Sequence, residues 1–294
     1  MKRLLVTGGD GLLAYAIKGI VPSGWEVFSL GRADFDLTQP GMMSRRLAEV
    51  KPDVVVNTAA YNLVDRCEVE RELSWSINAA GPERLAKLCL EKDVQLVHFG
   101  TDYVFDGAKG TPYLETDVPN PLNHYAAGKF AGEQAVLQAS PRNLVLRTSW
   151  VFGWHPTQSK TFVHSILKGA IERPLLKATT DQVSVPTFAT DLARWTLDLI
   201  GSDVGGLFHG VNDEGVSRFD WSKIILAEAV SAKLVSRLPE VEPVLSSFFN
   251  SSMRRPNYTV MSNEKLSRQL GYPMGSWRIG LRKMLARVAG FKVA

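Results

Sequence analysis

Short apolar runs alternate with longer amphipathic stretches through the first half of the chain, a pattern typical of βαβ units and a parallel sheet. The runs are compact enough to be buried on both faces and predict strands at residues 4–6, 27–30, 54–57, 96–99 and 144–146. The longer stretches carry apolar residues three and four positions apart and predict helices at residues 12–20, 42–50, 70–90 and 125–137. We therefore expect an α/β fold with a doubly wound parallel Rossmann sheet.

The alternation ends after Trp150, where an irregular loop at 153–158 and a Pro-stopped turn at 173–174 precede a mixed second region. Its predicted elements are a strand at residues 207–211 and helices at residues 162–171, 190–200, 219–229, 263–270 and 277–288. We expect residues 1–150 to form an NAD(P)-binding Rossmann domain, to which segments near 176–212 return. Residues 151–294 are expected to form mainly a smaller, mixed substrate-binding domain.

The composition is that of an ordinary folded protein of 294 residues, with 45% hydrophobic and 22% charged residues, which excludes disordered and coiled-coil classes. The two cysteines, Cys67 and Cys89, form neither a disulfide framework nor a C-x-x-C pair. The amino terminus reaches glycines after three apolar residues, too soon for a signal peptide or a membrane span. These features predict a cytoplasmic protein without a membrane partner, and the five scattered histidines predict no metal site.

Basic residues concentrate towards the end of the chain. From Arg254 onward there are nine Lys or Arg residues and a single acidic residue, Glu264, so this end should attract anions. No nucleic-acid motif accompanies the charge, and several of the basic residues fall at helical spacing opposite Trp277 and Leu281. We interpret the charge as the solvated face of a terminal amphipathic helix and expect no nucleic-acid partner.

A glycine-rich turn follows the first predicted strand. Residues 7–14 have the sequence Thr-Gly-Gly-Asp-Gly-Leu-Leu-Ala and lead into a predicted helix. Gly8 permits a tight turn, Gly11 lets backbone N–H groups approach a pyrophosphate, and Ala14 allows the helix to pack closely. The turn predicts a dinucleotide site that includes Gly8, Asp10, Gly11, Leu12 and Leu13.

The residue after the second predicted strand bears on the choice of cofactor. An NAD-preferring site usually has an acidic residue here for the ribose 2′-hydroxyl, whereas this chain has Arg32, which suits a 2′-phosphate. Asp34 and Asp36 follow closely, and Asp36 and Leu37 could equally bind the adenine edge. We therefore expect NADPH as the cofactor, with NADH as the alternative.

Tyr125 and Lys129 form a Tyr-x-x-x-Lys pattern, which places both side chains on one face of a predicted helix. Because a neighbouring ammonium stabilises a phenolate, we expect Lys129 to lower the pKa of Tyr125. Thr101 follows the fourth predicted strand, at the carboxyl edge where α/β sites form, and its hydroxyl could bond to a carbonyl oxygen. Together with the glycine turn, these residues predict one catalytic centre.

Longer motifs extend through most of the chain. They are Ala59-Ala60-Tyr61, Val64-Asp65, Asn78, Thr-Asp-Tyr-Val-Phe-Asp-Gly at residues 101–107, Pro121-Leu122-Asn123, Leu-Arg-Thr-Ser-Trp at residues 146–150, Asp181-Gln182, Val185-Pro186-Thr187 and Arg254-Arg255-Pro256. On these motifs the sequence resembles the extended short-chain dehydrogenase/reductase family and, within it, the dTDP-4-dehydrorhamnose reductases.

The resemblance implies that Thr101, Tyr125 and Lys129 are the catalytic residues, and that hydride passes from NADPH to C4 of a nucleotide-bound keto-sugar. Tyr125 would then protonate the alkoxide, Lys129 would also hold the nicotinamide ribose, and Thr101 would polarise the ketone. Further cofactor contacts are implied for Ala59, Ala60, Tyr61 and Asn78, and substrate contacts for Val64, Thr101, Tyr103, Trp150 and Gln182. The basic end adds Arg254 or Arg255 as the residue for the substrate diphosphate.

The implied function is NADPH-dependent reduction of the C4 ketone of a nucleotide-bound 6-deoxy-4-keto sugar, above all dTDP-4-dehydro-L-rhamnose to dTDP-L-rhamnose. Related dehydratases carry Glu where this chain has Tyr103, which argues against dehydration. Two alternatives stay open: an epimerase or other oxidoreductase acting on a nucleotide sugar, and a non-catalytic NADP-binding regulatory subunit resembling that of methionine adenosyltransferase. Trp154-His155-Pro156 departs from the family beside the expected substrate pocket, so the identity of the sugar is left open. A homodimer is also possible on the sequence alone.

Overall fold

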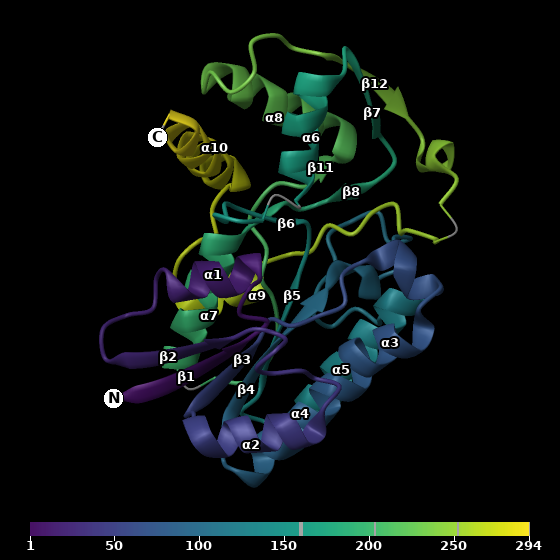
Figure 1. Ribbon diagram of the computed structural model, residues 1–294. Coiled ribbons are helices and arrows are strands. Elements are labelled where there is room, and N and C mark those ends of the chain that lie inside the picture. Colours follow the sequence, from purple (N-terminus) through teal and green to yellow (C-terminus); the bar gives the residue numbers. More distant parts are fainter. Residues whose placement is uncertain (159–160, 203, 252, 294) are drawn as a thin grey trace.

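The computed structural model describes residues 1–158, 161–202, 204–251 and 253–293. A six-stranded parallel sheet runs through its larger layer in the order β2-β1-β3-β4-β5-β10 (Figure 1). The predicted doubly wound α/β fold is therefore confirmed, and the chain reverses its direction of growth between β1 and β3. The strands are β1 (Lys2–Thr7), β2 (Trp25–Leu30), β3 (Val54–Asn57), β4 (Gln95–Thr101), β5 (Leu144–Thr148) and β10 (Gly206–His209).

Helices cover both faces of this sheet because its strands are apolar on both sides. Leu4 and Val6 of β1 pack under one pair of helices, while Leu5 between them packs under the other group. The first face is covered by α1 (Leu12–Lys18) and α7 (Ala189–Gly201). The second face is covered by α2 (Pro40–Val50), α4 (Gly81–Glu91) and α5 (His124–Ala139).

The helix predicted at residues 70–90 forms with an interruption. It consists of α3 (Arg71–Trp75), the π-helical turn η2 (Ser76–Ala80) and then α4. Pro82 lies four residues after Asn78 and has no N–H to donate to the Asn78 carbonyl, which favours a local change of hydrogen-bond register. Helix α5 packs against this turn, and Gly132 leaves room there for the Asn78 carbonyl oxygen.

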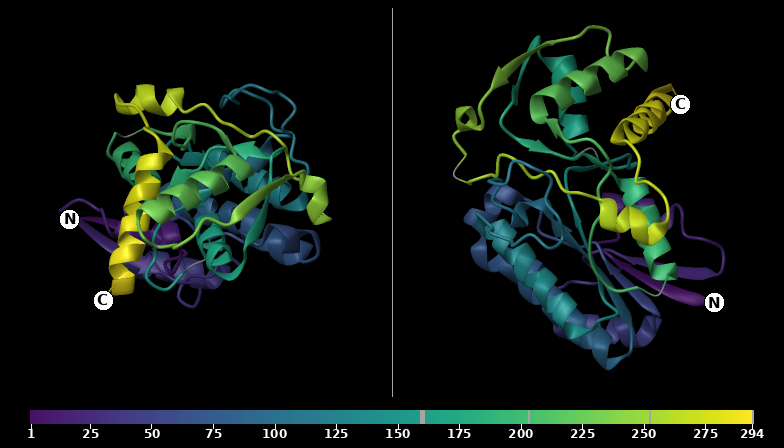
Figure 2. Two further views of the ribbon diagram at one scale, coloured as in Figure 1. Left: turned by 90° about the horizontal axis from the view of Figure 1, so that it is seen from above. Right: turned by 180° about the vertical axis from the view of Figure 1, so that it is seen from behind.

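A smaller layer lies beyond the carboxyl ends of the large sheet (Figures 1 and 2). Its core contains the fully buried Trp221 and Trp277, and residues 253–263 run along the junction of the two layers. No helix in the described ranges is long and apolar enough to cross a bilayer. The elements are α6 (Phe162–Glu172), α8 (Arg218–Ser231), α9 (Glu264–Leu270), α10 (Trp277–Val293), and the strand pairs β7 (Leu175–Thr179) with β12 (Glu240–Val244), β6 (Val151–Phe152) with β9 (Thr187–Phe188), and β8 (Val183–Ser184) with β11 (Val216–Ser217).

The segment near 176–212 is divided between the layers. Its first part, β7, pairs with β12 in the smaller layer, whereas α7 packs against α1 of the larger layer. The strand predicted at 207–211 forms β10, which pairs in parallel with β5 at the edge of the large sheet.

A buried ion pair joins α5 to the large sheet. The guanidinium of Arg147 in β5 donates to both carboxylate oxygens of Glu133 in α5, at 2.9 and 2.6 Å, and both side chains are at most 2% exposed. Gly100 in β4 makes room for this pair, because a Cβ there would lie 2.8 Å from a Glu133 oxygen. The pair therefore fixes the helix that carries Tyr125 and Lys129.

We predict that Glu133→Ala destabilises the fold by about 3–5 kcal/mol, because it leaves the Arg147 charge buried without its partner. Urea unfolding followed by circular dichroism would measure the loss. Glu83→Ala is the matched control, since Glu83 pairs with Lys87 on the surface of α4 and its removal should cost less than about 1 kcal/mol. Equal, small losses for both variants would contradict the assigned role of the pair.

Candidate active site

The glycine-rich turn lies at the carboxyl end of β1 and packs directly on the segment after β3. Gly8 has φ +65°, and a Cβ there would lie 2.8 Å from the backbone nitrogen of Ala59, so a larger residue does not fit. Gly11 is the N-cap residue of helix α1, and no side chain caps the first turn. Gly11, Leu12 and Leu13 line a cavity of about 570 Å³, together with Ala59 and Ala60.

Polar side chains under the turn tie three strands together. Thr7 donates to Asn57 Oδ1 at 2.6 Å, and Asn57 Nδ2 lies 3.1 Å from His98 Nδ1. Burial, reinforced by the charge of Lys129, holds the pKa of His98 well below its usual range. His98 is therefore neutral, and its Nδ1 accepts a hydrogen bond from Asn57 Nδ2, which fixes the ends of β1, β3 and β4 relative to one another.

Several residues predicted to bind the cofactor do not line the cavity. Arg32 lies at the surface, with its side chain 69% exposed and its Nε 3.1 Å from Asp36. Leu37 is buried in the core between the sheet and its helices, so its side chain is not presented to a ligand. The backbone oxygen of Asp10 accepts a hydrogen bond from Gln158.

Asn78 acts on the loop after β3. Its Oδ1 accepts from the Tyr61 nitrogen at 2.9 Å and its Nδ2 donates to the Tyr61 oxygen at 3.0 Å. The Tyr61 hydroxyl in turn donates to Glu70. Both residues thus hold the loop that carries Ala59 and Ala60, and their side chains are engaged within the protein.

Thr101, Tyr125 and Lys129 all line the same cavity. Tyr125 Oη makes a hydrogen bond with Thr101 and lies 3.5 Å from Asn62 Oδ1. Lys129 Nζ donates to the backbone oxygen of Phe99 at 2.5 Å. The structure therefore brings the three predicted catalytic residues together at the carboxyl ends of β4 and β5.

The expected effect of Lys129 on the Tyr125 phenol is not found. Burial raises the pKa of Tyr125 above its usual value, and the nearby Asp102 adds to the increase. Burial also lowers the pKa of Lys129 to about 8, against the attraction of Glu133. The prediction of a lowered Tyr125 pKa is thus wrong for this structure, because desolvation of the buried phenol dominates. Tyr125 keeps its proton at pH 7 and is suited to act as an acid.

Asp102, next to Thr101, is a buried carboxylate that accepts hydrogen bonds from three hydroxyl groups. Thr101 donates to Oδ1 at 3.2 Å, while Ser184 and Thr259 donate to Oδ2 at 2.9 and 2.5 Å. Burial raises the pKa of Asp102 to about 6, and the hydrogen bonds oppose this shift. Sequence reasoning missed Ser184 and Thr259, since no spacing pattern relates them to Asp102.

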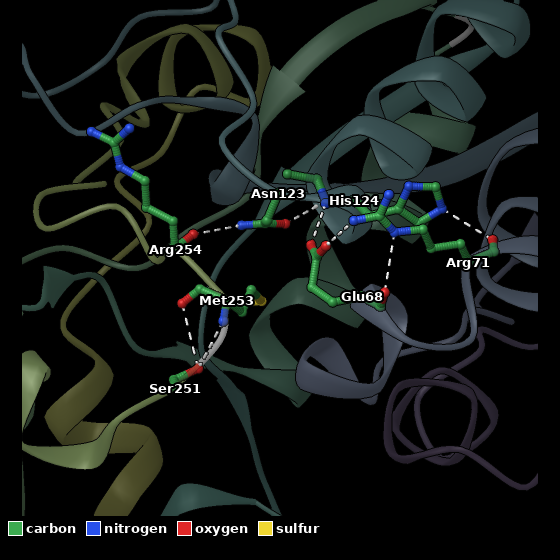
Figure 3. A network of polar contacts seen from close by, with 8 residues as sticks. Glu68, Arg71, Asn123, His124, Ser251, Met253 and Arg254 are labelled. Atoms are coloured by element: carbon green, nitrogen blue, oxygen red, sulfur yellow. Dashed lines mark hydrogen bonds and ion pairs between the residues drawn. The ribbon is translucent and has the colours of Figure 1, made fainter.

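Hydrogen bonds fix the start of α5 just before Tyr125 (Figure 3). Asn123 caps the helix by accepting from the Ala126 nitrogen at 2.8 Å, and its Nδ2 donates to the Arg254 oxygen at 3.0 Å. The His124 nitrogen donates to Glu68 at 2.6 Å. The phenol is therefore positioned by contacts from both layers of the molecule.

The residues predicted to bind substrate fall into two groups. Val64, Tyr103 and Trp150 line the cavity with Thr101. Outside the lining, Gln182 Oε1 accepts from Thr179 at 3.1 Å. Of these lining residues, Trp150 has a φ of +41°, a backbone conformation that is strained for a bulky side chain.

Neither predicted arginine lines the cavity. Arg255 forms two 2.7 Å contacts with the Asp65 carboxylate and a hydrogen bond with Tyr103. The Arg254 guanidinium is exposed and points away from the network around Asn123 (Figure 3). A third arginine, Arg218, does line the cavity, and no sequence pattern points to it beyond its place just before the helix predicted at residues 219–229.

We predict that the Asp102→Asn variant gains about 2 kcal/mol of stability over the wild type between pH 4 and pH 7. The pKa of Asp102 is raised to about 6 on folding, so the folded state binds the proton more tightly and loses stability as the pH rises through this range. Urea unfolding at several pH values measures the difference.

Asp106→Asn is the control with the opposite sign. Hydrogen bonds from Ala108 and Asn120 lower the pKa of Asp106, so the wild type loses this stabilisation as the pH falls. A pH-independent difference between the wild type and Asp102→Asn would rule out the buried, shifted carboxyl.

A family model and the similar sequences point to the same group of proteins. The model described as RmlD substrate binding domain matches residues 1–289. The dTDP-4-dehydrorhamnose reductase of Aggregatibacter actinomycetemcomitans is 32% identical over 294 residues, which cover 97% of this chain and 99% of that protein. The dTDP-4-dehydrorhamnose reductase of Mycolicibacterium smegmatis is 35% identical, over 98% of this chain and 86% of that protein.

Solved structures agree with the sequence relatives. The dTDP-4-dehydrorhamnose reductase of Bacillus anthracis in complex with NADP superposes with a TM-score of 0.90 at 30% identity, covering 98% of this chain and 100% of that one. The UDP-glucose 4-epimerase of Thermus thermophilus has a TM-score of 0.76 at 24% identity, covering 98% of this chain and 99% of that one, and shares the fold alone.

Proposed function

The chain belongs to the RmlD substrate binding domain family, together with the dTDP-4-dehydrorhamnose reductases, and on this premise we propose that it reduces the C4 ketone of dTDP-4-dehydro-L-rhamnose with NADPH. The observation that carries the proposal is the placement of Thr101, Tyr125 and Lys129 in one cavity with the glycine turn. A nucleotide turn and a proton donor in one cavity are what a nicotinamide-dependent carbonyl reduction needs.

The residues present fit a dinucleotide. Gly8 lets the turn pack on Ala59, Gly11 lines the cavity without a side chain over its backbone, and Ala59 and Ala60 are small enough for close approach along the next loop. Arg32 at the end of β2 would meet a 2′-phosphate once its contact with Asp36 is exchanged for that anion. NADPH, when bound, supplies the hydride that is added to C4.

Proton transfer falls to Tyr125. Its phenol is neutral at pH 7, so it can donate its proton to the C4 oxygen as hydride addition turns the ketone into an alcohol. Lys129 carries the adjacent positive charge and stabilises the phenolate that is left. The proton lost by Tyr125 and the hydride together balance the reduction.

Thr101 supplies a second hydrogen bond to the C4 oxygen. Its single hydroxyl proton is directed to Asp102 in this structure, and it would turn to the substrate. Asp102 then keeps the hydroxyls of Ser184 and Thr259 as donors to Oδ2, while Oδ1 gives up its hydroxyl donor to the substrate. Tyr103, where dehydratases carry a glutamate, offers no second carboxylate, which supports reduction without loss of water.

We also propose that the enzyme works in the cytoplasm, supported by its two cysteines, Cys67 and Cys89, both buried and free. A homodimer stays a prediction, and light scattering of the purified protein would test it.

We predict that Tyr125→Phe lowers kcat by roughly 10²- to 10⁴-fold because it removes the proton donor. NADPH binding should change by less than about threefold, since the ring and its packing stay in place. The assay follows NADPH absorbance with enzymatically generated dTDP-4-dehydro-L-rhamnose. Tyr272→Phe, which removes a surface hydroxyl bonded to Asp198, is the matched control with wild-type turnover. An active Tyr125→Phe enzyme would refute the mechanism.

We predict that Arg32→Ala weakens NADPH binding by roughly 10- to 100-fold, because charge-assisted hydrogen bonds to the 2′-phosphate are lost. NADH lacks this phosphate, so its affinity should change by less than about threefold. Titration of each cofactor by protein fluorescence gives both affinities. Arg45→Ala, an exposed arginine on α2, is the control and should leave both cofactors unaffected. Equal losses for NADPH and NADH would refute the phosphate contact.

A further inference from the structure

Arg218, at the start of α8, extends into the same cavity as Thr101 and Tyr125. Its guanidinium carbon lies 3.5 Å from the ring centre of Trp150 and 4.4 Å from that of Phe162. Trp221 is also close, at 5.4 Å. Three aromatic rings thus pack around a guanidinium that also lines the cavity.

Arg218 forms no ion pair in the part of the chain that the structure describes, although Tyr103 and Asp102 attract it from a longer distance. Among the described residues, no carboxylate lies within salt-bridge distance of Arg218. Burial lowers its pKa to about 10, against the attraction of Tyr103 and Asp102, so the group stays charged at pH 7. A desolvated charge without a counter-ion is costly, and an anionic ligand would remove this cost.

The other cations near the site have different partners or positions. Lys129 donates to the Phe99 carbonyl, and Arg255 is held by Asp65. The exposed Arg254 guanidinium does not line the cavity. Of the cavity-lining residues in the described ranges, Arg218 is the one arginine, so it is the group that can meet an anion there with a bidentate fork.

We propose that Arg218 binds the diphosphate of the nucleotide-sugar substrate and thereby sets the position of the sugar ring before Tyr125. The inference rests on the proposed function. A deoxyhexose and a pyrimidine carry no negative charge, so the diphosphate is the anion that the substrate brings. The proposed site of the cofactor diphosphate is separate, at the glycine turn between β1 and α1 in the larger layer.

Trp150 gains a different role from the one expected of it. Because the guanidinium lies 3.5 Å from its ring centre, one face of Trp150 is covered by Arg218, and this face cannot stack on a sugar. Trp221 stacks in parallel with Trp150 at 5.4 Å and supports it. Trp150 is therefore a positioning residue that holds the arginine.

The test compares ligands that differ in phosphate charge. Isothermal titration with dTDP, thymidine and NADPH is carried out on the wild type, Arg218→Gln, Arg218→Lys and the surface control Arg268→Gln, whose side chain is 80% exposed. We expect Arg218→Gln to bind dTDP roughly 10- to 100-fold more weakly, with thymidine and NADPH within about threefold of the wild type. Arg218→Lys should keep part of the affinity, and Arg268→Gln all of it.

Trp150 variants test the positioning role. Trp150→Ala should weaken dTDP binding several-fold, whereas Trp150→Phe, which keeps a ring under the guanidinium, should restore most of it. Unchanged NADPH affinity in each variant shows that the fold is intact. A general structural defect would instead lower NADPH and dTDP affinity together, and Phe would not rescue dTDP selectively.

Several outcomes would overturn the proposal. They are unchanged dTDP affinity in Arg218→Gln, an equal loss for dTDP and thymidine, a loss confined to NADPH, and no dTDP binding by the wild type. Because binding is measured without turnover, the proposed reaction is tested separately. If the wild type binds dTDP through Arg218 but does not oxidise NADPH with the keto-sugar, the anion site stands and the proposed reductase activity is refuted.

Discussion

The buried ion pair between Glu133 and Arg147 is the contact on which the geometry of the site depends. It fixes α5 against β5 with two short hydrogen bonds in a region closed to water. One turn earlier on the same helix, Lys129 reaches the Phe99 carbonyl of β4, and one further turn earlier is Tyr125. The distance from phenol to sheet is thus set by packing that has no part in the chemistry, which is how a rigid scaffold holds reactive groups.

Burial then sets the protonation of the groups that this scaffold brings together. Desolvation keeps the Tyr125 phenol neutral, lowers the pKa of Lys129 to about 8 and raises the pKa of Asp102 to about 6. Each shift favours the uncharged form; hydrogen bonds to Tyr125 and Asp102, and the charge of Glu133 near Lys129, oppose the shifts only in part. A reductase benefits from this, because the tyrosine must arrive with its proton, while a lysine with a pKa of about 8 is still mostly charged at pH 7 and can stabilise the phenolate.

The smaller layer completes the site by contacts between distant parts of the chain. Ser184 and Thr259 donate hydrogen bonds to Asp102, and the Arg254 carbonyl accepts a hydrogen bond from Asn123, the N-cap residue of α5. Arg218 adds a cation from α8 to the same cavity. Both layers therefore contribute to one cavity: the larger layer brings the glycine turn and Tyr125, and the smaller layer brings Arg218.

Local periodicity and spacing were enough to predict the sheet, the glycine turn and the Tyr125–Lys129 face, because each depends on residues close together in the chain. Tertiary structure alone decided the rest. It placed Arg218 in the cavity and Arg254 and Arg255 outside its lining, gave Asp102 two remote hydroxyl donors, and reversed the expected shift of the Tyr125 pKa. These outcomes depend on burial and on contacts between segments more than 50 residues apart, and no local pattern records either quantity.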